Sequence, residues 1–183
     1  MGAVPPTVAP QRVRDVTPAD VPEIARIYNH YVEHTVITFE VDPVSTQAMM
    51  ERVATVQAKR LPWLVWVEEA RVLGYAYATT FRDRAAYRHT VETTVYLDPE
   101  ATGRGGGGAL YDAILDQLEK RGVRLVVGGI ALPNAASVAL HESRGFGHVG
   151  TFTGIGRKHG RWIDVGFWQK QLAGPADPDV KST

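Results

Sequence analysis

The 183-residue sequence contains no cysteine, which excludes disulfide bonds, thiolate metal sites and a cysteine nucleophile. It also lacks an excess of either charge, because 20 Lys and Arg residues balance 20 Asp and Glu residues. A neutral chain gives no electrostatic reason to expect binding to nucleic acid or to an anionic membrane surface. No apolar run reaches the ~20 residues of a membrane span, and the N-terminal residues 1–6 lack the pattern of a signal peptide. We therefore expect a cytoplasmic protein with neither nucleic-acid nor membrane partners.

The length favours one domain, which we expect at residues 11–172 between flexible tails at residues 1–10 and 173–183. Apolar periodicity predicts strands at 12–16, 63–68, 71–80, 91–97, 124–130, 146–152 and 163–169. It predicts helices at 18–33, 46–60, 109–121 and 135–144, three of them opened by Thr17, Ser45 and Asn134. This order predicts an α+β fold with a mixed sheet of about seven strands and four flanking helices, not a series of βαβ units.

The most informative stretch runs from residue 91 to residue 111. Its first part alternates Val91, Thr93, Val95 and Leu97 with Glu92, Thr94 and Tyr96, which predicts a strand with one apolar and one polar face. Five glycines between positions 103 and 108 then precede a helix that we expect to begin at Ala109. Glycines before a helix N-terminus allow main-chain N–H groups to surround an anion, commonly a phosphate. A strand carboxylate followed by such a loop suggests an enzyme with a phosphorylated cosubstrate.

Two better-known phosphate loops do not fit these glycines. Residues 103–108 spell G-x-G-x-x-G, but residues 98–102 separate them from the strand and no acidic residue ends the next strand, as a dinucleotide site requires. A P-loop needs Lys followed by Ser or Thr where Ala109 and Leu110 stand. A flexible surface loop is the plain alternative, and the glycines alone do not exclude it.

The order of elements and this loop resemble the GNAT superfamily of acyl-CoA-dependent N-acyltransferases. The superfamily motif, Q/R-x-x-G-x-G/A, aligns with residues 102–107, matching both glycine positions and departing only at Thr102. Further segments across residues 12–171 resemble the phosphinothricin N-acetyltransferase branch, including Tyr28-Asn29-His30-Tyr31, Glu92-Thr93-Thr94-Val95-Tyr96, Leu132-Pro133-Asn134 and Lys158-His159-Gly160-Arg161-Trp162. The resemblance implies a mainly antiparallel sheet, acetyl-CoA as cosubstrate, a small-molecule amine as acceptor and a homodimer.

Two residues are candidates for the chemistry. An amine attacks a thioester only as the free base, so a general base accelerates the reaction by ~10²–10⁴. Glu92 matches the position of the family's proposed base; a solvated strand carboxylate is the alternative. His141 shares a helix face with Asn134 and Ser137. The resemblance places His141 where many members carry a Tyr that protonates the leaving thiolate, and the roles of acid, relay and structural residue stay open.

The resemblance also implies binding residues. For acetyl-CoA these are Val95, Tyr96 and Leu97 on the strand, Gly103, Arg104, Gly105, Gly106, Gly107 and Gly108 in the loop, and Asn134 and Ser137 on the next helix. For the acceptor they are Phe39, Arg82, Arg84, Tyr87 and Tyr96, with the arginines holding acid groups. Solvated loop arginines, one paired with Asp83, are the alternative. His30 and His34 have helical spacing but no third ligand, so we expect no metal.

Together these features predict acetylation of the amino group of a small amino-acid-like substrate, of the phosphinothricin or methionine sulfone and sulfoximine type. Such an activity would confer antibiotic or herbicide resistance. Direct transfer is expected because the chain has no cysteine to carry the acyl group. Two alternatives remain: a GNAT enzyme for another amine, such as an N-terminal peptide, polyamine or antibiotic, and a non-catalytic acyl-CoA-binding module.

Overall fold

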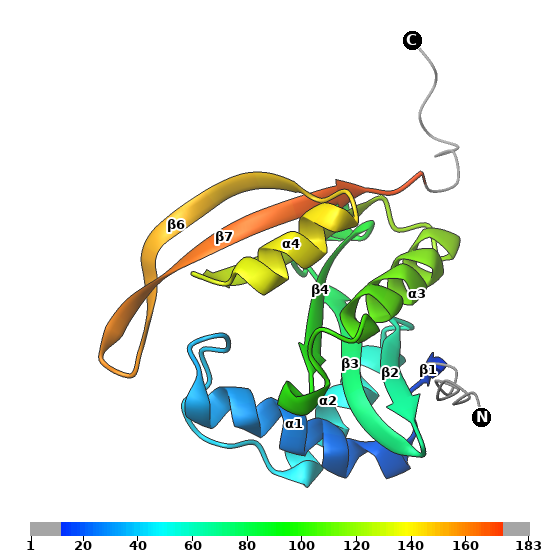
Figure 1. Ribbon diagram of the computed structural model, residues 1–183. Helices are drawn as coiled ribbons and strands as arrows, with labels where there is room; N and C mark the ends of the chain where they lie inside the picture. Colours follow the sequence, from blue (N-terminus) through cyan, green and yellow to red (C-terminus); the bar gives the residue numbers. More distant parts are fainter. Residues whose placement is uncertain (1–11, 174–183) are drawn as a thin grey trace, which may run out of the picture.

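The computed structural model describes residues 12–173, which form a twisted sheet with helices on both faces and a long two-stranded arm (Figure 1). Residues 1–10 and 174–183 of the expected tails lie outside the described residues. The helices are α1 (Val21–His34), α2 (Thr46–Ala58), α3 (Gly106–Lys120) and α4 (Ala135–Ser143), and short 3-10 turns are η1 (Pro18–Asp20), η2 (Ala85–Tyr87) and η3 (Pro99–Ala101). The strands are β1 (Arg12–Asp15), β2 (Trp63–Glu68), β3 (Arg71–Thr80), β4 (Thr90–Leu97), β5 (Leu125–Leu132), β6 (Gly147–Lys158) and β7 (Arg161–Gln171).

All seven strands belong to one sheet, in the order β1-β2-β3-β4-β5-β7-β6. Neighbouring strands are antiparallel except β4 and β5, which run parallel. A parallel pair requires a crossover connection, and α3 provides it. The predicted class, a mainly antiparallel α+β sheet of seven strands with four helices, is confirmed.

The two faces of the sheet bury separate apolar cores, because side chains alternate along each strand. On one face Leu110 of α3 packs against the strands, and on the other Met49 of α2 does so. The central strand β4 contributes to both cores, with Val91 on the α3 side and Tyr96 on the side of α1 and α2. The expected polar face of β4 is therefore only partly polar, since Tyr96 is buried beneath α1.

The predicted boundaries are wrong at two places. Helix α3 begins at Gly106 and not at Ala109, so three of the loop glycines belong to its first turn. The expected link between the last two strands, residues 154–160, is mostly strand, and only two residues separate β6 from β7. These residues, His159 and Gly160, have φ values of 47° and 74°, the positive values that a tight two-residue hairpin turn requires.

Within residues 12–173 no helix combines the length and the apolar character needed to cross a membrane. The same residues contain no group of three His, Asp or Glu side chains placed to hold a metal ion. His30 and His34 stack on each other, with ring centres 4.9 Å apart, and Nδ1 of His34 is 3.0 Å from the carbonyl oxygen of His30. The helical spacing of the two histidines therefore accounts for a local contact between their rings along α1.

Candidate active site

The site forms where β4 and β5 separate. The two strands pair over three residues, from Thr90 with Leu125 to Glu92 with Val127, and the described pairing ends there. The amide N–H of Asp98 is bonded to the carbonyl of Leu73 on β3, at 2.8 Å. Main-chain groups point alternately to the two sides of a strand, so those of Val95 and Leu97 face the side that β5 has left.

A cleft of about 450 Å³ follows this separated edge. Tyr31 of α1 and Ile37 of the segment after α1 form part of its wall. Most of the predicted cosubstrate residues line it: Val95, Tyr96, Leu97, Gly103, Gly105, Gly107, Gly108, Asn134 and Ser137. A smaller pocket of about 50 Å³ shares part of this wall and is lined by Thr93, Tyr111 and His141 as well. Arg104 and Gly106 are not part of either lining.

The first turn of α3 opens onto the cleft without a side-chain cap. Gly105 is the N-cap, with φ 84°, and it has no side chain that could accept a hydrogen bond from the N–H groups behind it. The first N–H groups of a helix have no partner within the helix, and the helix dipole adds partial positive charge there. Gly107 and Gly108, which line the cleft, belong to this turn. The arrangement suits an anion such as a phosphate.

Two of the loop glycines have packing reasons of their own. A Cβ on Gly106 would lie 2.0 Å from the ring of Trp66, so this residue lets α3 approach β2 closely. A Cβ on Gly107 would lie 3.2 Å from Leu140 and 3.5 Å from Leu97, so a longer side chain would fill the end of the cleft. Arg104 forms an ion pair with Glu68 and lies over the ring of Trp66, with 5.8 Å between guanidinium and ring centre. Its side chain is therefore engaged with β2.

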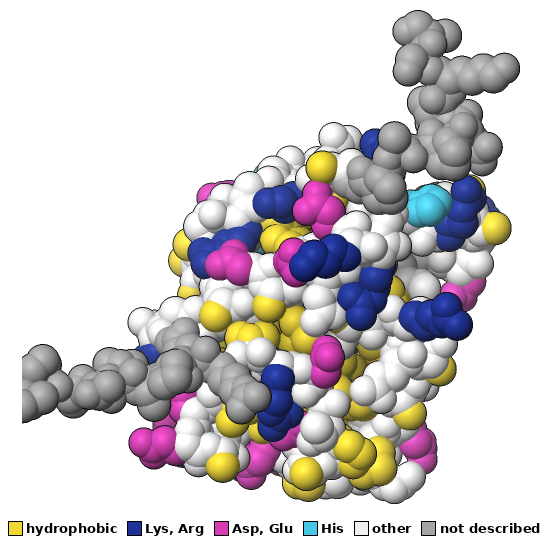
Figure 2. All heavy atoms as spheres, turned by 90° about the vertical axis from the view of Figure 1, so that its right-hand side faces the viewer, with side chains coloured by type: hydrophobic (Ala, Val, Ile, Leu, Met, Phe, Trp, Pro, Cys, Tyr) yellow, Lys and Arg dark blue, Asp and Glu magenta, His cyan; other side chains and the backbone are white. Residues whose placement is uncertain are grey.

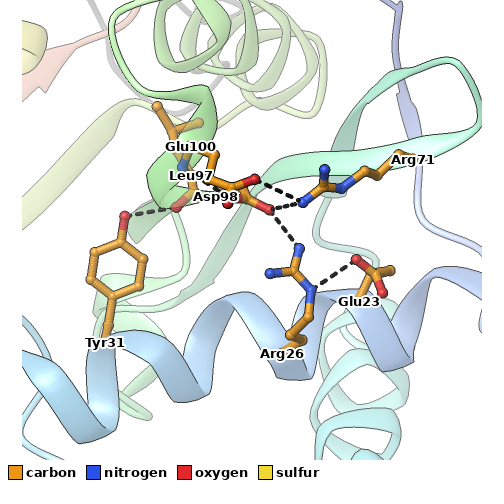
Figure 3. A network of polar contacts seen from close by, with 7 residues as sticks. All are labelled: Glu23, Arg26, Tyr31, Arg71, Leu97, Asp98 and Glu100. Atoms are coloured by element: carbon orange, nitrogen blue, oxygen red, sulfur yellow. Dashed lines mark hydrogen bonds and ion pairs between the residues drawn. The ribbon is translucent and has the colours of Figure 1, made fainter.

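A buried carboxylate fixes the turn that leads from β4 into the glycines. Asp98 is 1% exposed and accepts hydrogen bonds from Arg26 of α1 at 2.5 Å, Arg71 of β3 at 3.0 Å and the amide of Glu100 at 3.0 Å. Figure 3 shows both guanidinium groups directed at this carboxylate. Burial alone would raise the pKa of Asp98, but Arg26, the Glu100 amide and Arg71 together lower it below its usual value.

Glu92 is the last residue of β4 that pairs with β5, and its half-buried side chain has no ion-pair or hydrogen-bond partner among residues 12–173. Burial raises the pKa of its carboxyl group. Gly129 of β5 leaves room for it, because a Cβ there would lie 3.2 Å from Oε1 of Glu92. The side chain lines neither the cleft nor the inner pocket.

His141 approaches the same strand from the opposite face. A Cβ on Gly128 would lie 2.4 Å from its Nε2, so neighbouring glycines of β5 accommodate Glu92 on one face and His141 on the other. Nδ1 of His141 donates to the carbonyl of Ser137 at 2.8 Å, and Nε2 accepts from the hydroxyl of Tyr111 at 2.6 Å. Burial lowers the pKa of His141 and raises that of Tyr111. The neutral imidazole therefore has no spare proton in this arrangement.

The structure does not bring the predicted acceptor residues together in one cavity. Arg82 lies over Phe81, at 5.2 Å, and both line an apolar groove of about 520 Å³ with Val127 and Phe167, on the Glu92 face of the sheet. Arg84 and Tyr87 are exposed on the segment between β3 and β4, outside that lining. Phe39 packs against Gly156 of β6, and Tyr96 lines the cleft and the inner pocket.

A larger cleft, of about 760 Å³, contains none of the predicted site residues. It lies where α2 and α3 end and is lined by Lys59, Arg60, Arg88 and Arg121, with Asp15 as its carboxylate. Figure 2 shows Lys and Arg side chains gathered on the upper half of the face on the right of Figure 1. This cleft has no helix N-terminus in its lining, so the separated strands are the better candidate site.

Comparison with known proteins identifies the family of the chain. The model of the acetyltransferase (GNAT) domain family matches residues 13–166. The chain belongs to the GNAT acetyltransferases. It is 40% identical over 173 residues to a phosphinothricin N-acetyltransferase of Streptomyces viridochromogenes, with 94% of each chain covered. It is 38% identical over 171 residues to an L-methionine sulfoximine/L-methionine sulfone acetyltransferase of Salmonella typhimurium, covering 92% of this chain and 98% of the relative.

A solved structure supports the same assignment. A GNAT superfamily phosphinothricin acetyltransferase from Sinorhizobium meliloti, crystallised in complex with acetyl-CoA, superposes with a TM-score of 0.88 at 38% identity, covering 94% of this chain and 93% of that one. The chain is therefore an N-acetyltransferase with the GNAT fold, and its resemblance to the phosphinothricin N-acetyltransferase branch is confirmed.

The residues of the candidate site that were not identified from the sequence include Tyr31, Ile37 and Tyr111 in the linings and Asp98 in the supporting turn. Tyr31 lies in the helical apolar pattern of α1, and its hydroxyl donates to the carbonyl of Leu97 at 2.7 Å. Tyr111 follows the glycines at a position that a helical pattern assigns to the core. Of these residues, only Asp98 could have been recognised from the sequence, because an acidic residue directly after a strand often caps a turn.

Replacing Asp98 with Asn should lower the free energy of unfolding at pH 7 by about 1–3 kcal/mol, since it removes the charge that both arginines bind. The pKa of Asp98 is lower in the folded protein, so its contribution is present above ~4, the unfolded pKa, and is lost as pH falls through the folded pKa. In urea unfolding experiments, the difference in the free energy of unfolding between wild type and variant should therefore narrow as the pH falls below ~4. Glu100→Gln, at an exposed partner of Arg71, is the matched control. An equal effect of both variants would contradict the account.

Proposed function

We propose that this GNAT enzyme transfers the acetyl group of acetyl-CoA directly to the amino group of a small amino-acid-like substrate, with Glu92 as general base. The observation that carries the proposal is the separated edge of β4, which lies between an uncapped helix N-terminus and an unpaired carboxylate. The helix N-terminus would suit a diphosphate, the strand edge an extended chain of amides, and the carboxylate the amine that attacks the thioester.

The residues of the cleft fit acetyl-CoA. The first turn of α3 would hold the diphosphate through main-chain N–H groups. Val95 and Leu97 would bind the amide groups of pantetheine through main-chain groups that β5 does not pair, as an added strand does, although the Leu97 carbonyl already accepts from Tyr31. The side-chain oxygen of Asn134 already caps α4 through the amide of Ser137, at 3.1 Å, which leaves its NH₂ group for the cosubstrate. The Sinorhizobium relative crystallised with acetyl-CoA supports this assignment.

Glu92 would act on the acceptor amine, directly or through water. The amine nitrogen forms the new bond to the carbonyl carbon, and the proton lost by nitrogen passes to the Glu92 carboxylate. The carbon–sulfur bond breaks, and coenzyme A leaves as a thiolate with the bonding electron pair. Burial raises the pKa of Glu92 and so brings it closer to the pKa of the amine whose proton it must accept. His141 would support the reaction by holding Tyr111 beside the inner pocket, because both of its nitrogens are already engaged.

The acceptor class is inferred from the relatives and from the arginines. The relatives named for phosphinothricin and for methionine sulfoximine and sulfone favour an amino acid with a second acidic or polar oxygen group. Arg82 and Arg84 lie on the segment that precedes β4, where a guanidinium could bind such a group. The activity would then confer resistance to such compounds. Other amines and a non-catalytic acyl-CoA-binding role are the alternatives that the experiments below separate.

We further propose a cytoplasmic homodimer. Support for the dimer comes from four apolar side chains of the arm that are between 53% and 69% exposed: Val149, Phe152, Ile155 and Trp162. Exposed apolar surface of this kind marks a site of contact with another protein chain. A single-chain mass in light scattering at micromolar concentration would contradict the dimer.

Replacing Gly107 with Asp should reduce the affinity for acetyl-CoA by more than ~10-fold, because the new carboxylate would repel the diphosphate. Gly147→Asp makes the same change where a Cβ meets nothing within 4 Å, and it should bind normally. Calorimetric titration of both folded variants checks this. Retained affinity in the Gly107 variant would remove the helix turn as the diphosphate site.

Replacing Glu92 with Gln should lower kcat by about 10²–10⁴ and leave the KM for acetyl-CoA nearly unchanged, because only the proton acceptor is lost. The pKa of Glu92 is raised on folding, so its contribution to stability is present at low pH and is lost as pH rises through the folded pKa. The variant should therefore be at least as stable as wild type at pH 7. A thiol-release assay and thermal unfolding measure the two effects; unchanged turnover would exclude Glu92 as base.

Arg82→Ala and Arg84→Ala should each raise the KM for an acidic amino acid, by about tenfold for a lost bidentate contact, and affect neutral amines little. Thiol release across a panel of amines, with Lys120→Ala on α3 as control, checks both. The panel also tests the proposed function: release with an acidic amino acid supports it, preference for polyamines or peptides favours the alternative acceptors, and binding without release favours a sensor.

A further inference from the structure

Lys158, the last residue of β6, is a buried cation at the tip of the arm. It is 2% exposed, and its Nζ donates to the carbonyl of Thr38 at 2.9 Å and points to that of Tyr31 at 3.4 Å. Burial lowers the pKa of this ammonium, and nearby Glu40 raises it in part. Figure 1 shows the arm bending until its tip lies beside the segment that follows α1. An interaction across 120 residues thus joins the arm to the connector between α1 and α2.

Thr38 is held from two sides. Its carbonyl accepts from Lys158, while its hydroxyl bonds to that of Tyr28 at 2.8 Å. The residues before and after it face the candidate site: Ile37 lines both the cleft and the inner pocket, and Phe39 lies against β6. A Cβ on Gly156 would lie 2.2 Å from the Phe39 ring, so that contact depends on glycine. Fixing residue 38 therefore fixes the two side chains beside it.

The second carbonyl ties Lys158 to the end of α1. Tyr31 lies in the last turn of that helix, where carbonyl groups carry partial negative charge that favours a cation. The hydroxyl of Tyr31 donates to the carbonyl of Leu97 on β4. One ammonium group thus links the arm, the end of α1 and the connector.

We propose that Lys158 is a positioning residue that sets the acceptor-facing wall formed by residues 37–39. This inference rests on the proposed function for the identity of the acceptor. A neutral side chain of similar length leaves the Thr38 carbonyl without its donor, and the wall loses its link to the arm. Acceptor binding then suffers, because small displacements of a positioning group cost large factors in rate. The hydrogen bonds of Lys158 go to Thr38 and Tyr31 and not to the glycine turn that would hold the diphosphate, so acetyl-CoA binding is affected less.

The test compares Lys158→Met with Arg157→Met. Arg157 is the neighbouring residue, and its exposed side chain lies over the ring of Trp162. Lys158→Met should raise the KM for the acceptor about tenfold, change the KM for acetyl-CoA less than about twofold, and speed amide hydrogen exchange in residues 35–42 about tenfold. Lys158→Arg should recover part of each effect because it keeps the cation. Arg157→Met should resemble wild type throughout.

Equal rises in both KM values, or unchanged exchange in residues 35–42 of a folded Lys158→Met protein, would overturn the inference. If the wild-type enzyme acetylates no amine of the panel, the proposed function fails. The exchange experiment needs no turnover, so it still decides whether Lys158 holds the connector.

Discussion

The separation of β4 from β5 is the constraint on which the rest of the structure depends. Two parallel strands that paired along their whole length would satisfy each other's main-chain groups and leave no room between them. Here pairing stops at Glu92, and the main-chain groups of Val95 and Leu97 face a cleft. An edge of this kind, in the middle of a sheet, must be supported by surrounding contacts and covered by a ligand or water.

The surrounding contacts come from every layer of the fold. Arg26 and Arg71 hold Asp98 at the end of β4, and Tyr31 bonds to the carbonyl of Leu97. Gly106 lets α3 pack on Trp66, which fixes the helix whose first turn faces the cleft. On β5, Gly128 and Gly129 leave space for His141 and Glu92 on opposite faces. The polar groups of the site are thus placed by small residues and buried charges rather than by the site's own loops.

Much of this could be predicted from the sequence, because local patterns determine it. The alternation in β4, the glycines before α3 and the capping residues Ser45 and Asn134 each act within a few residues, and the elements that they predict are present. Glycines misled the prediction twice: those at the start of α3 and those in the second half of β6 were assigned to loops, although Gly106 packs against Trp66 and Gly156 against Phe39.

Interactions between distant residues were not predictable from one sequence. The hydrogen bond of Tyr111 to His141, the two arginines on Asp98 and the reach of Lys158 to Thr38 join elements whose proximity only the fold determines. The acceptor residues show the same limit. Arg82 and Arg84 are close in sequence, yet only Arg82 lines the groove on the Glu92 face.

A crystal structure of the protein with acetyl-CoA and an acidic amino acid tests the central claim most directly. The account predicts the diphosphate at the N–H groups of residues 105–108, pantetheine along Val95 and Leu97, and the thioester between β4 and β5 near Glu92. Coenzyme A bound elsewhere, for example in the basic cleft at the ends of α2 and α3, would contradict it.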